Sequence, residues 1–321
     1  MISHGKDIKV FTGNANPKLA EDICKLMGTK LGESEVGKFS DGEIFVSLYE
    51  TVRGSDAFVV QSTCGEVNNN LMELLIMIDA LKRASAGRIT AVMPYYGYAR
   101  QDRKAKARDP ISAKLVANML VAAGADRVLT MDLHAAQIQG FFDIPVDHIF
   151  GSNVLAPYVA SLNLKKLIVA SPDVGGSKRA SNFAKKLHIM TDREVPMVIC
   201  YKHRPEFNKV SEMRILGDIY GKDVVIFDDM VDTAGTLCKA AEIMKEGGAK
   251  SVRAVVSHAV LSGSACQRIE ESVLEEVVCT DSLPIDPARC SKLHVVSLAK
   301  SIAATISAIQ NHTPVSEANT Q

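Results

Sequence analysis

The chain has 321 residues, with 37 lysines and arginines against 37 aspartates and glutamates, so its formal net charge is zero. At roughly 150 residues per domain, this length predicts about two domains, each large enough for its own core. Neutral charge excludes a strongly basic nucleic-acid binder, and no apolar run approaches the roughly 18 residues of a membrane span. Seven cysteines without a C-x-x-C pair fit free thiols in a reducing compartment. We therefore expect a cytoplasmic protein without nucleic-acid or membrane partners.

Short β-branched runs alternate with helical patterns along the whole chain. Asn16 followed by Pro17 predicts a helix start. In chain order, strands are expected at 8–11, 57–60, 89–93, 128–131, 167–170, 224–227 and 252–257, and helices at 71–82, 113–123 and 237–245. This alternation predicts an α/β protein whose domains are each a mainly parallel sheet flanked by helices.

The two halves of the chain resemble each other. Residues 54–60 (GSDAFVV) are similar to 221–227 (GKDVVIF), and the strand that follows each of them after a helix matches again. Duplication explains this better than convergence of two unrelated βαβ units, which is the alternative. We predict an N-terminal domain at 1–150, a C-terminal domain at 151–310, and a polar tail at 311–321 that frays.

The strongest local signal lies at 224–236, where a buried strand runs into Asp228 and Asp229 and then into a small, hydroxyl-rich turn before a helix. Ligands of open α/β sheets bind at such strand ends. Backbone N–H groups at the helix start, aided by the hydroxyls of Thr233 and Thr236, suit a phosphomonoester. The two carboxylates suit vicinal sugar hydroxyls or Mg²⁺, whereas a solvated capping turn would not need this acid pair.

A second strand end, at 171–179, carries Asp173 and the pair Gly175 and Gly176 before another expected helix. The glycines allow backbone to approach a ligand closely, and Asp173 is placed to hold a cation on it. Glycines in such turns often serve conformation alone, so this signal is weak by itself. Neither a Walker loop nor a G-x-G-x-x-G fingerprint is present, which disfavours P-loop kinases and Rossmann dehydrogenases.

Asp132 and His134 stand two residues apart at another expected strand end. Strand alternation places them on one face, where they could share a metal, although a lone histidine is more often part of a core or hydrogen-bonded.

A basic stretch follows Tyr98 and holds five cations within nine residues: Arg100, Arg103, Lys104, Lys106 and Arg108. The alternatives are a solvated loop, nucleic acid and polyphosphate. Because the chain is neutral and the stretch lacks interleaved aromatic residues, we favour polyphosphate.

Together these motifs resemble the ribose-phosphate diphosphokinases, or 5-phosphoribosyl 1-diphosphate (PRPP) synthetases, of the phosphate-dependent class. The resemblance covers nearly the whole chain. Its most specific segment is 132–147, whereas 228–236 is shared with the wider group of phosphoribosyltransferases. Segments 38–43 (KFSDGE) and 98–102 (YARQD) are similar to those that bind ATP in the synthetases.

The resemblance implies two phosphoribosyltransferase-like domains and transfer of the diphosphoryl group of ATP to the anomeric hydroxyl of ribose 5-phosphate, giving PRPP and AMP for nucleotide biosynthesis. It also implies Mg²⁺ as cofactor, inorganic phosphate as an activator, and a homo-oligomer, usually a hexamer, with ATP at a dimer boundary. The residues it implies are Lys202 and Arg204 for catalysis; Phe39, Asp41 and Glu43 of a neighbouring chain with Arg100, Gln101 and Asp102 for ATP; Asp228, Asp229, Asp232, Thr233, Ala234, Gly235 and Thr236 for ribose 5-phosphate; His134 and Asp173, with Asp132 as a weaker candidate, for metal; and Arg53, Lys104 and Arg108 for a regulatory anion.

Two departures from the family fall on regulatory segments. Ala107 stands where many members have serine, and Asp109 adds an acid beside it. The C-terminus, at 315–318, lacks the aromatic residue that relatives carry there. Because Asp109 repels anions, we expect weakened phosphate activation and weakened ADP inhibition.

Two other functions compete with this interpretation. A phosphoribosyltransferase shares the 228–236 loop but has no need of the ATP segments. A noncatalytic regulatory subunit would assemble with an active synthetase. The intact His134, Asp173, Lys202 and Arg204 favour catalysis.

Overall fold

The computed structural model describes residues 7–203 and 212–318, which fold as two compact units. Unit 1 comprises residues 1–150, 282–284 and 297–321, and unit 2 comprises 151–281 and 285–296. The expected C-terminal domain ran from 151 to 310, whereas the chain returns to unit 1 at 297. The physical reason is that helix α8 (Ala299–Asn311) packs against helix α1 (Pro17–Met27).

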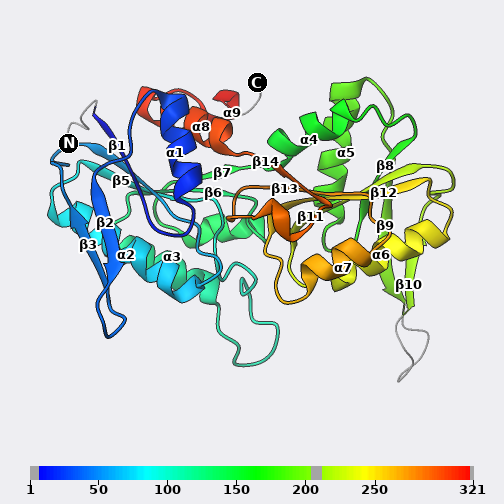
Figure 1. Ribbon diagram of the computed structural model, residues 1–321, viewed down its shortest axis with the longest axis horizontal. Coiled ribbons are helices and arrows are strands. Elements are labelled where there is room, and N and C mark those ends of the chain that lie inside the picture. Colours follow the sequence, from blue (N-terminus) through cyan, green and yellow to red (C-terminus); the bar gives the residue numbers. More distant parts are fainter. Residues whose placement is uncertain (1–6, 204–211, 319–321) are drawn as a thin grey trace. The chain divides into compact units, whose positions relative to one another are not determined.

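Unit 1 is built on a parallel sheet of five strands in the order β1-β4-β5-β6-β7, with a separate antiparallel hairpin, β2-β3. Figure 1 shows α1 and α8 on one face of this sheet and α2 and α3 on the other. Its remaining elements are β1 (Ile8–Thr12), β2 (Ser34–Lys38), β3 (Ile44–Leu48), β4 (Asp56–Val60), α2 (Val67–Arg83), β5 (Arg88–Met93), α3 (Ser112–Ala123), β6 (Arg127–Met131), the 3-10 helix η1 (Ala136–Phe141), β7 (Val146–Ile149) and α9 (Val315–Ala318). The tail expected to fray therefore holds a short helix, α9, which packs on α8.

Unit 2 is built on a sheet of seven strands in the order β10-β9-β8-β11-β12-β13-β14, parallel except for the β10-β9 pair. Helices α4 and α5 cover one face, and α6 and α7 cover the other (Figure 1). Its elements are α4 (Ser152–Ser161), β8 (Leu167–Ser171), α5 (Ser177–Thr191), β9 (Met197–His203), β10 (Glu212–Leu216), β11 (Asp223–Val231), α6 (Gly235–Glu246), β12 (Ser251–Ala259), α7 (Ala265–Glu271), β13 (Val277–Thr280), the 3-10 helix η2 (Pro287–Arg289) and β14 (Leu293–Val296).

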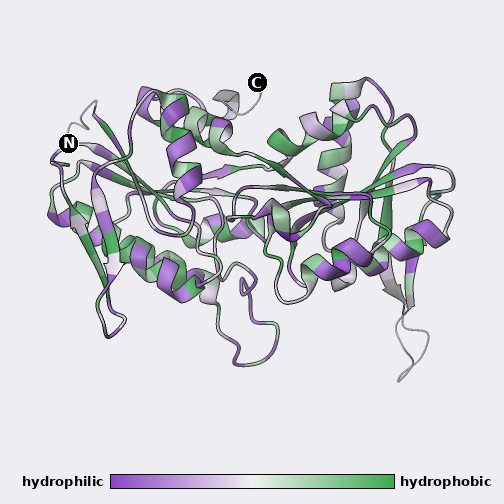
Figure 2. Ribbon diagram, viewed as in Figure 1, coloured by the Kyte–Doolittle hydropathy of each residue, from purple (hydrophilic) through white to green (hydrophobic). Residues whose placement is uncertain are grey.

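The central strands are mostly apolar because helices cover both faces of each sheet. Phe58 and Val59 of β4 are fully buried in unit 1. In unit 2, the rings of Phe183 and Phe227 stack with their centroids 4.0 Å apart and nearly parallel. Figure 2 shows the hydrophobic strands inside each unit and the hydrophilic faces of the helices turned outward.

The two sheets share one strand order. Strands β1-β4-β5-β6-β7 of unit 1 correspond to β8-β11-β12-β13-β14 of unit 2, which adds β9 and β10 at one edge. Strands β4 and β11 also begin alike, since Asp56 and Asp223 are both buried at the first position of their strands. The sequence similarity between 54–60 and 221–227 thus falls on equivalent strands.

All seven cysteines are free, and six of them are buried. Burial raises the pKa of Cys279 to about 12, which keeps this thiol protonated at neutral pH. Across residues 7–203 and 212–318, the structure contains no helix that is both long and apolar enough to span a membrane.

Candidate active site

The acidic segment of unit 2 lies at the carboxyl end of β11. The strand was expected to end at Phe227, but its pairing with β12 continues to Val231, opposite Ala259. Asp228 and Asp229 therefore stand on the strand itself and not in a loop after it. The apolar run breaks at these acids, and it was this break that made the strand look shorter.

The turn after β11 leads directly into α6, which begins at Gly235, two residues before the expected start. Ala234 holds the turn with a left-handed φ of 61° and occupies the N-cap position. An alanine has no side-chain acceptor, so it cannot cap the first N–H groups of the helix. Thr233, Gly235 and Thr236 are exposed. This geometry is suited to a phosphate held by backbone N–H groups and hydroxyls.

The loop between β8 and α5 approaches the acidic segment closely. The Gly176 N–H donates to Asp173 Oδ1 at 2.8 Å, and Ser171 Oγ donates to the Asp173 carbonyl at 2.7 Å. A Cβ placed on Gly176 would lie 2.9 Å from Ser171 Oγ and 3.8 Å from Asp228 Oδ1. The position requires glycine for this close approach. Asp173 itself is exposed.

Arg179, on the first turn of α5, bridges the two acids of β11. Its Nη1 donates to Asp228 Oδ1 at 2.9 Å and to Asp229 Oδ1 at 2.7 Å. The side chain of Asp229 is 5% exposed and that of Asp228 is 27% exposed. Burial and the neighbouring Asp229 carboxylate raise the pKa of Asp228 to about 7, and Arg179 opposes this rise. Arg179 was not among the predicted site residues, and a single arginine on a helix gives no signal in the sequence.

Three predicted ATP contacts lie at the tip of the β2-β3 hairpin in unit 1. The tip is closed by hydrogen bonds from the Phe39 N–H to the Glu43 carbonyl, at 2.8 Å, and from the Glu43 N–H to Asp41 Oδ1, at 3.1 Å. Phe39 is 57% exposed, and its ring lies 5.1 Å, between centroids, from that of Phe45 on the same hairpin. An exposed aromatic ring beside two carboxylates is available to a nucleotide.

Arg100 and Gln101 line a cleft of about 760 Å³ in unit 1. The other lining residues are Gly65, Glu66, Val67, Asn68, Asn69, Tyr95, Gly97 and Tyr98. Glu66 forms an ion pair at 3.3 Å with Lys38, which ends the first strand of the hairpin. The cleft is large enough for a nucleotide, and the consecutive residues Arg100 and Gln101 both line it.

Asp102 accepts a hydrogen bond from Gln137 Nε2 at 3.0 Å, so the basic stretch meets the segment that follows His134. Strand β6 ends at Met131, and Asp132 has a positive φ of 34°. Strand alternation therefore does not extend to Asp132 and His134, and its prediction of one shared face does not apply. Asp132 is buried, whereas His134 is exposed.

The predicted regulatory cations Arg53, Lys104 and Arg108 are all exposed on unit 1. Asp109, the acid that departs from the family pattern, is hydrogen-bonded within its loop, because its Oδ2 accepts the Lys106 N–H at 2.8 Å. Asp109 thus fixes the conformation of the loop as well as adding negative charge to it.

Lys202 lies on β9, where its backbone pairs with Met213 on β10, and Arg204 lies outside the described residues. Within the described ranges, the structure groups no three His, Cys, Asp or Glu side chains into a metal site. The predicted ligands His134 and Asp173 belong to different units.

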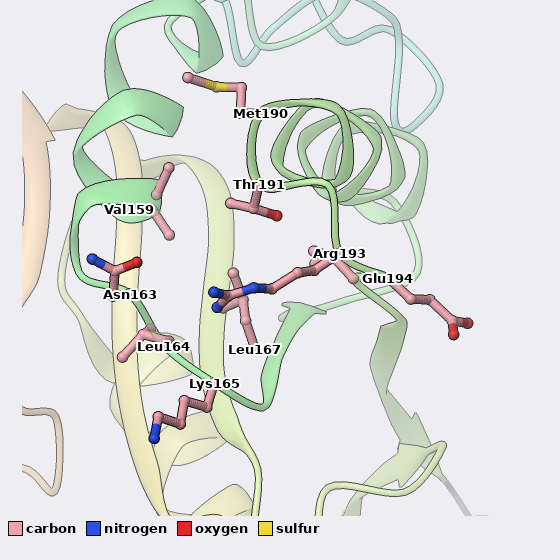
Figure 3. Close-up of a pocket in the computed structure, with 11 residues that line it drawn as sticks. Val159, Asn163, Leu164, Lys165, Leu167, Met190, Thr191, Arg193 and Glu194 are labelled. Carbon is pink, nitrogen blue, oxygen red and sulfur yellow. The ribbon is translucent and has the colours of Figure 1, made fainter.

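A second hollow, of about 250 Å³, lies in unit 2 between the end of α4 and the end of α5 (Figure 3). Arg193 reaches into this region, whereas Lys165 and Glu194 point away from it. It contains none of the predicted site residues.

The chain is similar to known proteins along nearly all of its length. The profile for the N-terminal domain of ribose phosphate pyrophosphokinase matches residues 8–124, and that for the phosphoribosyl synthetase-associated domain matches 173–318. The chain is 54% identical to the ribose-phosphate pyrophosphokinase of Clostridium acetobutylicum over 320 residues, which is 99% of this chain and 98% of that protein. It is 52% identical to the ribose-phosphate pyrophosphokinase of Pasteurella multocida over 314 residues, which is 97% of this chain and 98% of that protein. The crystal structure of phosphoribosylpyrophosphate synthetase from Mycobacterium smegmatis matches with a TM-score of 0.89 at 43% identity, covering 95% of this chain and 99% of that one.

The fold is therefore of the phosphoribosyltransferase-like class, with two mainly parallel sheets flanked by helices, as predicted. The chain belongs to the ribose-phosphate pyrophosphokinase family. Its activity is the synthesis of PRPP from ribose 5-phosphate and ATP, a kinase-type transfer in nucleotide biosynthesis, which confirms the predicted function.

Proposed function

We propose that ribose 5-phosphate binds at the carboxyl end of β11. The observation that carries this assignment is the junction of β11 and α6, where two carboxylates stand beside an uncapped helix start with exposed hydroxyls. The exposed turn formed by Thr233, Gly235 and Thr236 holds the 5-phosphate. Asp228 and Asp229 accept hydrogen bonds from the sugar hydroxyls, and Asp232 and Ala234 complete the loop.

ATP binds in the cleft of unit 1 that Arg100 and Gln101 line, and Asp102 follows them in the chain. The exposed hairpin tip with Phe39, Asp41 and Glu43 reaches the nucleotide of a neighbouring chain. This arrangement makes the dimer the smallest complete assembly, and the family resemblance supports a hexamer of this chain.

The reaction joins the anomeric oxygen of ribose 5-phosphate to the β-phosphorus of ATP. The bond between the β-phosphorus and the oxygen bridging to the α-phosphorus breaks, AMP leaves with that electron pair, and the hydroxyl proton passes to solvent. Negative charge grows on the bridging and equatorial oxygens in the transition state. Lys202 and Arg204 stabilise this charge, and exclusion of water prevents hydrolysis of ATP.

The residues fit Mg²⁺ held mainly by substrate phosphates. Asp173 is exposed, and its carboxylate accepts the Gly176 N–H through Oδ1, which leaves Oδ2 for a cation. Mg²⁺ commonly binds through one or two carboxylates and substrate phosphates and needs no cage of protein ligands. We assign Asp173 of unit 2 as a Mg²⁺ ligand. His134 and Asp132 are the metal candidates of unit 1, where the proposed ATP cleft lies. When bound, Mg²⁺ supplies neutralisation of phosphate charge.

We place the chain in the phosphate-dependent class, with a regulatory anion held by Arg53, Lys104 and Arg108. Asp109, fixed to the backbone of the same loop, lowers the anion affinity of this site. Titrating the activity with inorganic phosphate tests this assignment. A shallow response that needs high phosphate is expected, and a steep, saturable response at low phosphate contradicts it.

A pair of variants tests the two substrate sites. Thr236→Val removes a hydroxyl at nearly constant volume and is expected to raise KM for ribose 5-phosphate about tenfold, with KM for ATP unchanged. Arg100→Ala is expected to show the opposite pattern. If either variant moved both KM values alike, the assignment of separate sites would be wrong.

A further inference from the structure

The contact between Arg179 and the acid pair points to a role for this arginine that the predicted site did not include. We infer that Arg179 is a positioning residue, which fixes Asp228 and Asp229 in the orientation and charge state that bind the hydroxyls of ribose 5-phosphate. This inference rests on the proposed function of the acid pair.

The geometry of Asp228 leaves one oxygen for the substrate. Both donors to this carboxylate, Arg179 Nη1 and the Asp229 N–H, bind Oδ1, each at 2.9 Å. A carboxylate held at one oxygen by two donors has a fixed rotation, so Oδ2 keeps one direction. The side chain is 27% exposed, so a ligand can reach it.

The same nitrogen, Arg179 Nη1, also binds the carboxylate of Asp229. Its side chain is 5% exposed and lies 2.7 Å from Arg179 Nη1. Two carboxylates this close repel each other, and removing one from water costs more when the other is charged. One guanidinium between them offsets part of this repulsion and favours the ionised form of Asp228, whose pKa is still raised to about 7.

The titratable groups on the elements next to Asp228 include Asp173, in the loop between β8 and α5, and His258 of β12, whose backbone pairs with Met230. Directly opposite Asp228, β12 has Val256, and β8 ends with Ser171. Among the described residues, Arg179 is the cation that ion-pairs with Asp228.

Arg179 lies close in the chain to the loop that packs against Asp228. Arg179 is the third residue of α5, and this helix follows the loop whose Gly176 lies against Asp228. The loop that carries Asp173 and the strand that carries the acid pair are therefore tied together by one side chain. A change at Arg179 acts on sugar binding through Asp228 and not by contact with ATP.

The test compares Arg179→Gln with Arg179→Lys and with the control Lys185→Gln, which removes a charge from an exposed position on the same helix. For each variant, KM for ribose 5-phosphate and for ATP is measured at pH 7 and at pH 9. Arg179→Gln is expected to raise KM for ribose 5-phosphate at least about tenfold at pH 7. The factor should shrink at pH 9, because without the cation Asp228 needs a higher pH to ionise. Arg179→Lys should recover most of the wild-type pH dependence of KM for ribose 5-phosphate, and Lys185→Gln should match the wild type.

An equal loss at both pH values, or a loss shared with KM for ATP, would overturn the positioning role and show a structural one. No change in Arg179→Gln would overturn it as well. The variant Asp228→Asn distinguishes a failure of the role inferred for Arg179 from a failure of the proposed sugar site. If Asp228→Asn leaves KM for ribose 5-phosphate unchanged, the assigned sugar site is wrong; if it raises that KM and Arg179→Gln does not, only the role of Arg179 is wrong.

Discussion

The closest packing in the proposed sugar site is at Gly176, and it gives a sharp prediction for the variant Gly176→Ala. The added methyl would lie 2.9 Å from Ser171 Oγ, which is fully buried and donates to the Asp173 carbonyl. Either Ser171 rotates and loses its hydrogen bond, or the loop moves away from β11. Overpacking of this kind costs about 1–3 kcal/mol. For a domain of this size, that cost corresponds to a Tm lower by roughly 2–12 °C.

Function should fall together with stability, because the same loop carries Asp173 and leads into Arg179. We expect kcat/KM for ribose 5-phosphate to fall about tenfold or more, since small displacements of positioning groups cost large factors. The assay is a thermal melt with steady-state kinetics on the same preparation. Gly140→Ala is the matched control, because a Cβ at Gly140 meets no heavy atom within 4 Å.

A second substitution tests the cause. Ser171→Ala removes the hydroxyl that the new methyl would meet, so the double variant Ser171→Ala/Gly176→Ala should be more stable than the two single effects predict. A double-mutant cycle measures this coupling, which we expect to be about 1 kcal/mol or more. Strictly additive effects, or a Gly176→Ala protein with wild-type Tm and kinetics, would refute the packing argument.

Three further predictions concern other parts of the chain. Arg88→Ala should destabilise unit 1 by about 3–5 kcal/mol, because it leaves the buried Asp56 carboxylate without its ion pair; a melt no different from that of Arg83→Ala, at an exposed pair, would contradict this. Lys202→Ala should lower kcat about a hundredfold with little change in KM. Steady-state kinetics that show an effect on KM alone would contradict its assigned role in stabilising the transition state. Asp109→Asn keeps a side-chain oxygen for the loop backbone but removes the charge, so the phosphate concentration for half-maximal activation should fall severalfold; an unchanged activation curve would argue against charge repulsion there.

The parallel core of each sheet could be predicted from the sequence, because its strands are buried on both faces and appear as continuous apolar runs. Strands β4, β5, β6, β8, β11 and β12 all fall where such runs were found. The β2-β3 hairpin was not predicted, since its residues are half-buried and its pattern is mixed. Strand β11 was predicted too short because two acids interrupt the run, while backbone pairing with β12 continues past them.

The features that could not be predicted, the packing of α8 and the position of Arg179, depend on contacts between residues far apart in the chain. Helix α8 follows the C-terminal sheet in the chain, yet it packs on α1 at the other end of the sequence. Arg179 is a similar case in the site. Its segment was noted for its glycines, but only the fold brings the arginine to Asp228 and Asp229, 49 and 50 residues further along the chain. The acids and the hydroxyl turn were found because they are adjacent in sequence.

Diphosphoryl transfer by this chain is best tested by following both products of the purified protein without any partner. Ribose 5-phosphate, Mg²⁺ and ATP labelled at the β-phosphorus are mixed, and AMP and PRPP are quantified over time. Equal amounts of AMP and PRPP are expected, with the label in PRPP. Formation of ADP in place of AMP, or no PRPP at any phosphate concentration, would contradict it.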